Sequence, residues 1–250
     1  MPPRRPDRLS TIAHADRRVL SPVSDGKLAS ILGLLELPAR ARVLDLCCGK
    51  AEVLVRILEA HPDATGLGVD LNETYVRDAR REARARGVAE RVELVHGDAW
   101  AYPLEPGAFD AVVSLGGAYR DESRRSFLSA LRELVRPDGQ VLVGDGFYRR
   151  PPEPAELAAD GWTVGATPSH ADQVALATEV GLVPLHTATS SDDEWDAYEG
   201  AYLRAVQRWA RAHPEDPEAD AMVGFVQWWH QRYLEWRRDT LGFGLYLYAR

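Results

Sequence analysis

Short apolar runs alternate with helical patterns along residues 42–145, and this alternation constrains the fold more than any other feature of the chain. A Pro-Asp-Gly turn at 137–139 precedes the last of these runs. Strands that alternate with helices predict a parallel sheet covered by helices on both faces. The helices are expected at about 51–60, 73–86 and 123–135. The five apolar runs expected to be strands are 42–47, 66–71, 91–95, 109–115 and 140–145.

The pattern changes after residue 150. Residues 151–170 are rich in proline and glycine, so we expect an irregular segment there. Ser191 and Glu194 form a capping-box start for a later helix, and Pro217 suits the first position of another. The expected order is a helix, a strand, two long helices and a last strand, at 171–180, 182–189, 193–212, 217–239 and 242–249.

These elements predict a seven-stranded α/β sheet with helices on both faces and a helical hairpin inserted between the last two strands. A helix over 24–36, with Ser24 as its N-cap, precedes the first strand. The chain then divides into an N-terminal arm with the first helix, an α/β core, the hairpin and the final core strand, at 1–40, 41–190, 191–241 and 242–250.

Acidic and small residues gather where three of the expected strands end. Asp45 lies at the end of the first strand and is followed by the small residues of a Cys-Cys-Gly turn at 47–49. Asp70 ends the second strand, and Asp98 follows the third. The carboxyl ends of parallel strands share one edge of a sheet, and open α/β sheets bind ligands there. Small side chains in the first turn would let a ligand approach the backbone closely.

These segments together resemble the class I S-adenosylmethionine-dependent methyltransferases over about residues 40–146. The matching stretches are VLDLCCG at 43–49, GVDLN at 68–72, HGDA at 96–99, FDAVVSLG at 109–116 and LVRPDGQVLVGD at 134–145. The resemblance implies a Rossmann-like methyltransferase fold with S-adenosylmethionine as cofactor. In that family an acidic-x-Gly-x-Gly-x-Gly motif wraps the methionine part of the cofactor. Here Cys47 and Ala51 replace the outer glycines, and both are small enough for us to expect an open pocket.

The resemblance also implies roles for individual residues. Asp70 would accept hydrogen bonds from the ribose, Asp98 from the adenine amine, and Ala99 would meet the adenine edge through its backbone. Ser114 and Leu115 would line the methionine end. The residues expected to bind the cofactor are Asp45, Cys47, Cys48, Gly49, Asp70, Leu71, Asp98, Ala99, Ser114, Leu115 and Gly116.

Other interpretations of these residues fit less well. A nicotinamide dinucleotide fold needs Gly-x-Gly-x-x-Gly at the first turn, and residues 45–55 do not supply it. Asp70 or Asp98 alone could simply cap a helix, but their joint order and spacing favour the cofactor. Two adjacent thiols with no other cysteine do not make a zinc site without distant histidines, so we expect no metal. Small residues packed in the cofactor turn explain Cys47 and Cys48 better.

The methyl acceptor should lie beyond the ends of the fourth and fifth strands. Asp145, Tyr119 and Tyr148 are the candidates for orienting or deprotonating it, although a carboxylate holding a turn and tyrosines in the pocket wall are the alternatives. The long helices carry aromatic residues at helical spacing, which is typical of helices packed on each other. Trp195 and Tyr198 could instead close over the acceptor. The expected substrate-binding residues are Tyr119, Tyr148, Trp195 and Tyr198.

Composition narrows the acceptor class. The formal net charge is −8 and the pI about 5.4, which argues against a polyanionic partner such as nucleic acid. Asn/Asp-Pro-Pro followed by an aromatic residue, the signature of base and glutamine methylation, is missing after the fourth strand. We therefore expect in-line methyl transfer to the nitrogen or oxygen of a small molecule, with planar aromatic or heterocyclic compounds among the acceptors. An RNA or protein methyltransferase and a non-catalytic S-adenosylmethionine-binding protein are the alternatives.

The remaining expectations concern location and assembly. No stretch approaches the roughly 18 apolar residues of a membrane helix, and no apolar segment of a secretory signal follows the basic start. With two adjacent cysteines and no disulfide framework, we expect a cytoplasmic protein without a membrane partner. A monomer and a homodimer are both compatible with the sequence.

Overall fold

One sheet of seven strands organises the computed structural model, which describes residues 8–117, 123–161 and 168–250. The strand order is β3-β2-β1-β4-β5-β7-β6. β7 runs antiparallel to β5 and β6, and the other neighbours are parallel. This confirms the predicted seven-stranded α/β class. The strands are β1 Arg42–Leu46, β2 Thr65–Asp70, β3 Val92–His96, β4 Phe109–Leu115, β5 Val135–Tyr148, β6 Val183–Thr189 and β7 Leu241–Ala249.

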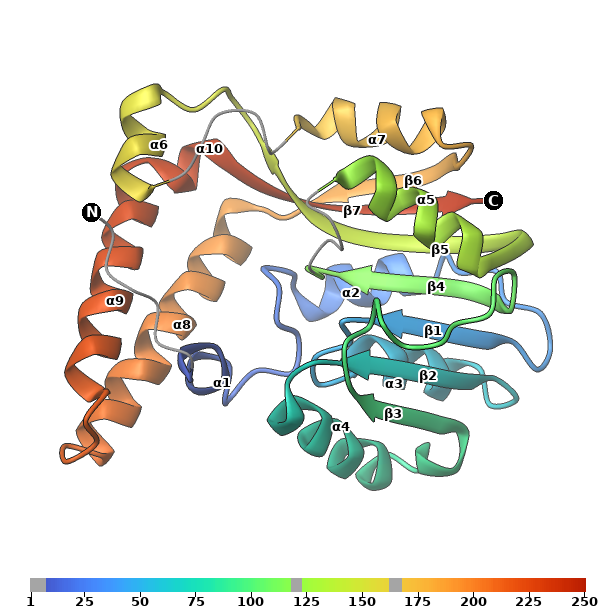
Figure 1. Cartoon of the computed structure of the whole chain (residues 1–250), viewed down its shortest axis with the longest axis horizontal. Helices are drawn as coiled ribbons and strands as arrows, with labels where there is room; N and C mark the ends of the chain where they lie inside the picture. Colours follow the sequence, from blue (N-terminus) through green and yellow to red (C-terminus); the bar gives the residue numbers. More distant parts are fainter. Residues whose placement is uncertain (1–7, 118–122, 162–167) are drawn as a thin grey trace.

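Helices cover both faces of the sheet (Figure 1). α2, α3 and α4 pack on one face in a cluster with the inward residues of β1 and β7, whereas α5 and α7 pack on the other. Ser24 caps α2 as predicted, because its side chain accepts a hydrogen bond from the Lys27 backbone N–H. The bounds are α2 Asp25–Leu32, α3 Glu52–Ala60, α4 Glu73–Ala85, α5 Arg124–Leu134 and α7 His170–Glu179.

Two long helices stand beyond the edge at which β1, β2, β3 and β4 end (Figure 1). They are α8 Asp192–Ala212 and α9 Ala219–Arg232, and α9 continues through a π-helical turn, Tyr233–Arg237, into α10 Arg238–Thr240. The short helix α1, Leu9–Ala13, packs on this hairpin in a separate apolar cluster that includes Tyr202, Met222 and Phe225. The hairpin therefore follows β6 and precedes β7, in the expected order.

Three local predictions differ from the structure. β5 begins at Val135 and contains the Pro-Asp-Gly turn as a bulge, because Phe109 pairs with Val135 but Ala111 pairs with Gln140. Residues Pro154–Asp160 form helix α6 in the segment expected to be irregular. Its first turn is closed by the Glu156 carboxylate, which accepts from the Glu153 backbone N–H at 2.7 Å.

The start of the second hairpin helix is the third difference. α9 begins at Ala219 rather than at Pro217, because the Asp216 carboxylate accepts from the Glu218 backbone N–H at 3.0 Å and closes a turn before the helix. No helix in the described ranges is both long enough and apolar enough to cross a membrane.

Candidate functional site

The turn between β1 and α3 has an unusual backbone. Cys47, Gly49 and Ala51 all have positive φ angles, of 57°, 55° and 55°. Residues with a Cβ rarely adopt this left-handed conformation, which costs roughly 1–2 kcal/mol per residue. These are the three positions at which the resembling family has glycine. Cys47 and Ala51 thus keep the backbone conformation of a glycine while carrying small side chains.

Hydrogen bonds from the neighbouring strand hold this turn. The Cys48 N–H donates to the Val69 carbonyl at 3.1 Å, and the Gly49 N–H donates to Asp70 Oδ2 at 2.7 Å. The other oxygen, Asp70 Oδ1, accepts from the Asn72 N–H at 2.8 Å. A carboxylate has about four lone-pair sites, so Asp70 retains acceptor capacity for a ligand. Burial raises the pKa of Asp70, and the two backbone donors oppose that rise.

Asp45 lies beneath the same turn and is only 3% exposed. Burial, together with the negative charge of Asp70, raises the pKa of Asp45 well above its usual value. Burial and the nearby carboxylates also raise the pKa of the Cys48 thiol. A thiol that is kept protonated is neither a strong nucleophile nor a metal ligand. Cys48 therefore serves packing in this turn.

The end of β3 offers a more open surface. Ala99 is buried, and Asp98 Oδ1 accepts from the Trp100 N–H at 2.9 Å. Leu71, at the end of β2, is 71% exposed although it is a large apolar residue. Its carbonyl lies 3.1 Å from His96 Nε2. An apolar side chain beside a carboxylate and a buried backbone suits a flat base such as adenine.

The end of β4 closes the site from the other side. Ser114 is 1% exposed, and its Oγ has no hydrogen-bond partner among the residues that the structure describes. The Gly116 N–H donates to the Gly144 carbonyl at 2.7 Å. A Cβ on Gly117 would come within 2.5 Å of Ser114 Oγ and 3.2 Å of the Cys47 side chain. Three residues predicted to bind one ligand, Cys47, Ser114 and Gly116, are thus adjacent to one another.

The N-terminal arm covers the turn. A Cβ on Gly49 would meet Leu20 Cδ1 at 2.7 Å, so Leu20 lies directly on the turn. Lys50 Nζ donates to the His14 and Ala15 carbonyls at 2.8 and 2.9 Å. Residues 18–21 of the arm, the turn, Asp45 and Leu115 enclose a cavity of about 40 Å³. No sequence pattern marks Leu20, because only tertiary packing brings it here.

Trp195 and Tyr198 of α8 join this region. Tyr198 Oη lies 2.9 Å from His14 Nε2 and 3.3 Å from the Leu20 carbonyl, so the hydroxyl binds the arm. Burial raises the pKa of Tyr198. The Trp195 ring lies 6.3 Å from the Tyr198 ring and stacks on Tyr233 at 6.4 Å. Its indole Nε1–H is buried and finds no hydrogen-bond partner within the described ranges.

Asp145 and Tyr148, which we also expected near the methyl acceptor, lie outside the region around the turn at 47–51. Asp145 Oδ2 is 2.9 Å from Arg124 Nη2 of α5, on the face of the sheet opposite α2 and α3. Burial raises the pKa of Asp145 to about 7, while the hydrogen bond from the Gly146 N–H opposes that rise. Tyr148 ends β5, pairs with Leu241 and is half-buried. Tyr119 lies outside the described residues.

A metal would need a different arrangement. Among the residues that the structure describes, no three His, Cys, Asp or Glu side chains are grouped so that they could hold a metal ion.

Comparisons with known proteins agree with this geometry. The model of a family described as a methyltransferase domain matches residues 43–139. A methyltransferase from Thiobacillus denitrificans, solved with S-adenosyl-L-homocysteine, is 29% identical, superposes with a TM-score of 0.88 and covers 99% of this chain and 100% of its own. A Geobacter sulfurreducens methyltransferase, solved with the same compound, is 25% identical, with a TM-score of 0.90 and coverage of 98% and 99%.

One curated relative is named for its methyltransferase activity. The 27-O-demethylrifamycin SV methyltransferase of Amycolatopsis mediterranei is 29% identical over 71% of this chain and 65% of its own length. The family model, the strand order and two full-length structural neighbours that hold the demethylated cofactor agree with one another. The chain therefore carries a methyltransferase domain, and its fold and full-length neighbours support a class I S-adenosylmethionine-dependent methyltransferase.

Proposed function

We propose that this enzyme methylates a small molecule and that the edge formed by β1, β2, β3 and β4 holds its cofactor. The observation that carries the cofactor site is the turn at 47–51, which keeps three left-handed residues and is held by Asp70. Asp70 would accept the ribose hydroxyls with its remaining lone pairs. Asp98, Ala99 and the exposed Leu71 would hold the adenine.

The methionine part fits the other half of the edge. Ser114 Oγ is a buried hydroxyl without a partner, and such groups usually await a ligand or an ordered water. Cys47, Gly49, Leu115 and Gly116 would surround the methionine chain, with Cys48 and Asp45 supporting the turn from below. Bound S-adenosylmethionine supplies a methyl group that is already activated. The chain's task is to hold the acceptor atom in line with it, and orientation of this kind can contribute roughly 7–11 kcal/mol.

The acceptor would lie between the strand ends and the hairpin. Trp195 supports this placement, because its buried indole N–H is free to donate to an acceptor molecule. Tyr198 would shape the wall while it anchors the arm, and Tyr148 would complete the pocket from the sheet side. The rifamycin-modifying relative supports an acceptor of small-molecule kind. An aromatic wall favours a planar phenol, amine or nitrogen heterocycle.

A general base is required only if the acceptor must lose a proton. Asp145 is the candidate for this base, because burial raises its pKa. While its carboxylate is paired with Arg124, Asp145 positions β5, and it would act as a base only if this ion pair opened. We therefore assign the main rate effect to positioning, and the nitrogen or oxygen acceptor would enter with its lone pair directed at the methyl group.

The test is a screen of phenols, amines and nitrogen heterocycles with isotope-labelled S-adenosylmethionine, followed by mass spectrometry. For the acceptor that reacts, Trp195→Ala should lower kcat/KM by about tenfold or more, as expected when an aromatic contact and one hydrogen bond are lost. Trp209→Ala is the matched control, since Trp209 lies on the same helix and packs against His213 instead. Methylation of RNA or protein alone, or cofactor binding without turnover, would contradict the proposal.

A further inference from the structure

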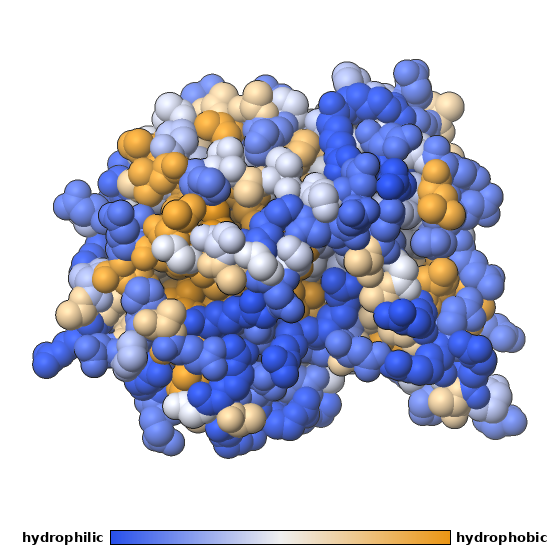
Figure 2. Space-filling model, turned by 180° about the vertical axis from the view of Figure 1, so that it is seen from behind, coloured by the Kyte–Doolittle hydropathy of each residue, from blue (hydrophilic) through white to orange (hydrophobic). Residues whose placement is uncertain are grey.

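A second cavity lies on the face of the molecule seen in Figure 2, where hydrophilic side chains gather along the boundary between the core and the hairpin. Its volume is about 920 Å³, within the range of roughly 300–1,000 Å³ that small-molecule sites occupy. The arm, the start of α2, Arg56 of α3 and one face of α8 line it. We call it the arm groove. It shares only Arg18 and Val19 with the small cavity over the turn at 47–51, which we call the cofactor turn.

The floor of the arm groove is open because α8 contributes small side chains. Ala197, Ala201 and Ala205 follow one another at intervals of four and face the groove. Residues four apart lie on one face of a helix. Larger residues at these positions would fill the space between α8 and the arm.

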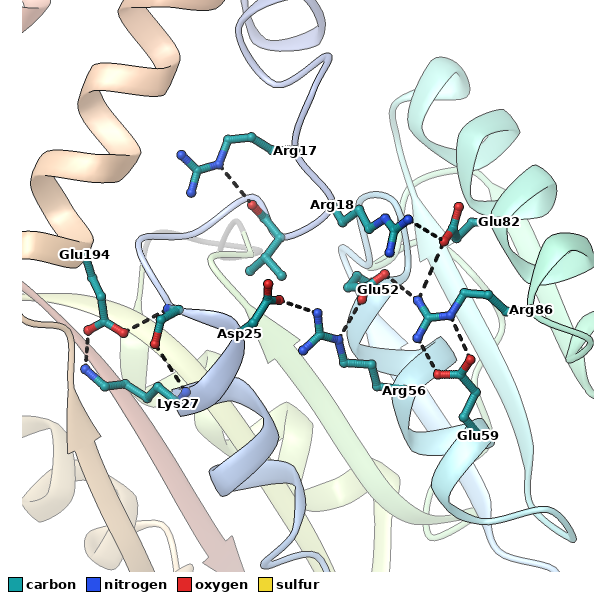
Figure 3. Close-up of polar contacts among 12 residues, drawn as sticks. Arg17, Arg18, Asp25, Lys27, Glu52, Arg56, Glu59, Glu82, Arg86 and Glu194 are labelled. Atoms are coloured by element: carbon teal, nitrogen blue, oxygen red, sulfur yellow. Dashed lines mark hydrogen bonds and ion pairs between the residues drawn. The ribbon is translucent and has the colours of Figure 1, made fainter.

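Most charges around the arm groove are neutralised by one another (Figure 3). Arg56 binds Asp25 and Glu52, and Lys27 binds Glu194. Two further cations at the rim are also paired, and these pairs are Arg18 with Glu82 and Arg208 with Asp16. The acidic residue Asp193 lies in the first turn of α8, where the helix dipole stabilises a negative charge.

Arg17 and Arg204 differ from these paired cations, because neither forms an ion pair with a described carboxylate. Arg17 is half-buried and donates only to backbone carbonyls, those of Val19, Ala197 and Tyr198, at 3.3–3.5 Å. Its guanidinium also lies 4.6 Å from the centre of the Tyr198 ring. No carboxylate of a described residue forms an ion pair with it, although Glu199 is near enough to favour its charge.

Arg204 lies two turns along α8 from the Ala197 carbonyl and is exposed to the groove. Its guanidinium forms no hydrogen bond or ion pair with any residue in the described ranges. Burial lowers the pKa of Arg17, and the positive charge of Arg204 lowers it further. Two cations that repel each other, neither of them in an ion pair with a described carboxylate, therefore face one open cavity.

We propose that the arm groove binds a small molecule carrying a phosphate or carboxylate group, and that Arg17 and Arg204 are its charge partners. Guanidinium groups match the planar geometry of both anions through paired N–H donors. The volume leaves room for a body attached to the anionic group. This site is separate from the cofactor edge, so it does not depend on the identity of the methyl acceptor.

The position of Arg17 in the arm links an anion bound in the arm groove to the cofactor turn. Arg17 and Arg18 precede Leu20 and Ser21, the arm residues that lie over the cofactor turn. An anion that holds Arg17 against α8 would hold this segment of the arm in place. Binding in the arm groove should therefore raise the affinity for S-adenosylhomocysteine, and the coupling must be reciprocal.

Calorimetric titration of the protein saturated with S-adenosylhomocysteine tests the proposal, with pyrophosphate and citrate as probes. We expect one binding site, with the stronger probe identifying the phosphate or carboxylate source. Arg204→Gln should weaken binding about tenfold, the effect of losing one charge-assisted hydrogen bond. Arg211→Gln is the matched control, because Arg211 lies on the same helix outside the groove and donates to the Gln207 carbonyl.

The opposite results overturn the proposal. Failure of both probes to bind would exclude an anion site, and equal weakening by Arg204→Gln and Arg211→Gln would reduce binding to general attraction by surface charge. Both variants change exposed side chains, and their melting temperatures verify that folding is intact. Because the readout is binding and not turnover, failure here is distinguishable from failure to find a methyl acceptor.

Discussion

The cofactor turn and the helical hairpin are held in opposite ways. Around the turn, bonds join Gly49 to Asp70 and Asp70 to Asn72, so close neighbours in adjacent loops define the geometry. The hairpin is held by distant partners. Tyr198 meets His14 across 184 positions of sequence, and Arg237 meets Asp160 across 77. The proposed cofactor site thus depends on short local patterns, whereas the proposed acceptor side depends on tertiary contacts.

The largest effect should come from breaking the buried ion pair of the hairpin. Asp160 Oδ2 lies 2.7 Å from Arg237 Nη2, and the two side chains are 0% and 2% exposed. Asp160→Ala removes the carboxylate that pairs with the buried Arg237 charge, so we expect the free energy of unfolding to fall by about 3–5 kcal/mol. Denaturant unfolding monitored by circular dichroism measures it.

The matched control for this change is an exposed ion pair. Arg125 binds Glu179, and both side chains are 53% exposed. Glu179→Ala should cost about 1 kcal/mol or less, since solvent screens such pairs. Similar losses in the two variants would show that Asp160 does not hold the hairpin.

Glu194 should give the next largest effect. Burial opposes its ionisation, but hydrogen bonds from Lys27, Ser24 and Ser191 lower its pKa to about 2, from an ordinary value of 4.5. The folded state therefore favours the carboxylate. Its stabilising contribution is complete above pH 4.5 and disappears as the pH falls toward 2.

We expect Glu194→Gln to lower the free energy of unfolding by about 2 kcal/mol at pH 7 and by progressively less below pH 4.5. Glu215→Gln, at an exposed position between the hairpin helices, should change it little at any pH. Urea unfolding of the parent and both variants across the pH range measures these changes. A difference in unfolding free energy between the parent and Glu194→Gln that does not depend on pH would show that Glu194 acts through its shape and not its charge.

Glu199, five residues along the same helix, should behave in the opposite sense. Burial raises its pKa to about 7, and Trp229 Nε1–H donates to Oε2 at 3.0 Å. The folded state favours the protonated form, so its contribution is present at low pH and is lost as the pH rises through 7.

Glu199→Gln keeps an oxygen for Trp229 and removes the titration. We expect the variant to be more stable than the parent by about 1 kcal/mol at pH 8.5, with the advantage disappearing below pH 4.5. Melting curves at the two pH values test this, and a variant that is less stable at pH 8.5 would contradict the assigned direction.

The smallest effect concerns the backbone of the cofactor turn. Ala51→Gly relieves a left-handed conformation, which costs roughly 1–2 kcal/mol, but loses about 0.5–1 kcal/mol to the greater freedom of glycine in the unfolded chain. We expect a slight net gain in melting temperature. Ala130→Gly in the middle of α5 should lower it instead, and a fall in both would show that position 51 is not strained.

The local patterns explain which features could be predicted from sequence. Alternating apolar runs located the strands, and the acidic strand ends located Asp45, Asp70 and Asp98 at one edge. Cys47 and Ala51 keep the left-handed backbone of a glycine-rich turn, and the open pocket expected from their small size stays a prediction. Each of these inferences depends on residues close together in the chain, where side-chain pattern and backbone conformation are directly linked.

The remaining features depend on contacts that no local pattern encodes. Leu20 covers Gly49 only because the arm folds back over the sheet. Asp145 was placed at the end of a strand, but the sequence did not reveal that its side chain lies on the α5 face against Arg124. The prolines of 151–154 concealed the start of α6, since proline is compatible both with loops and with the first turn of a helix.

The most direct test is calorimetric titration of S-adenosylhomocysteine into the parent protein, Asp70→Ala and Asp63→Ala. Asp63 is an exposed carboxylate in the loop before β2 and serves as the control. We predict that Asp70→Ala weakens binding about a hundredfold, because it loses the ribose acceptor and releases Gly49 N–H, while Asp63→Ala binds like the parent. Unchanged affinity in Asp70→Ala would contradict the assignment of this edge as the cofactor site.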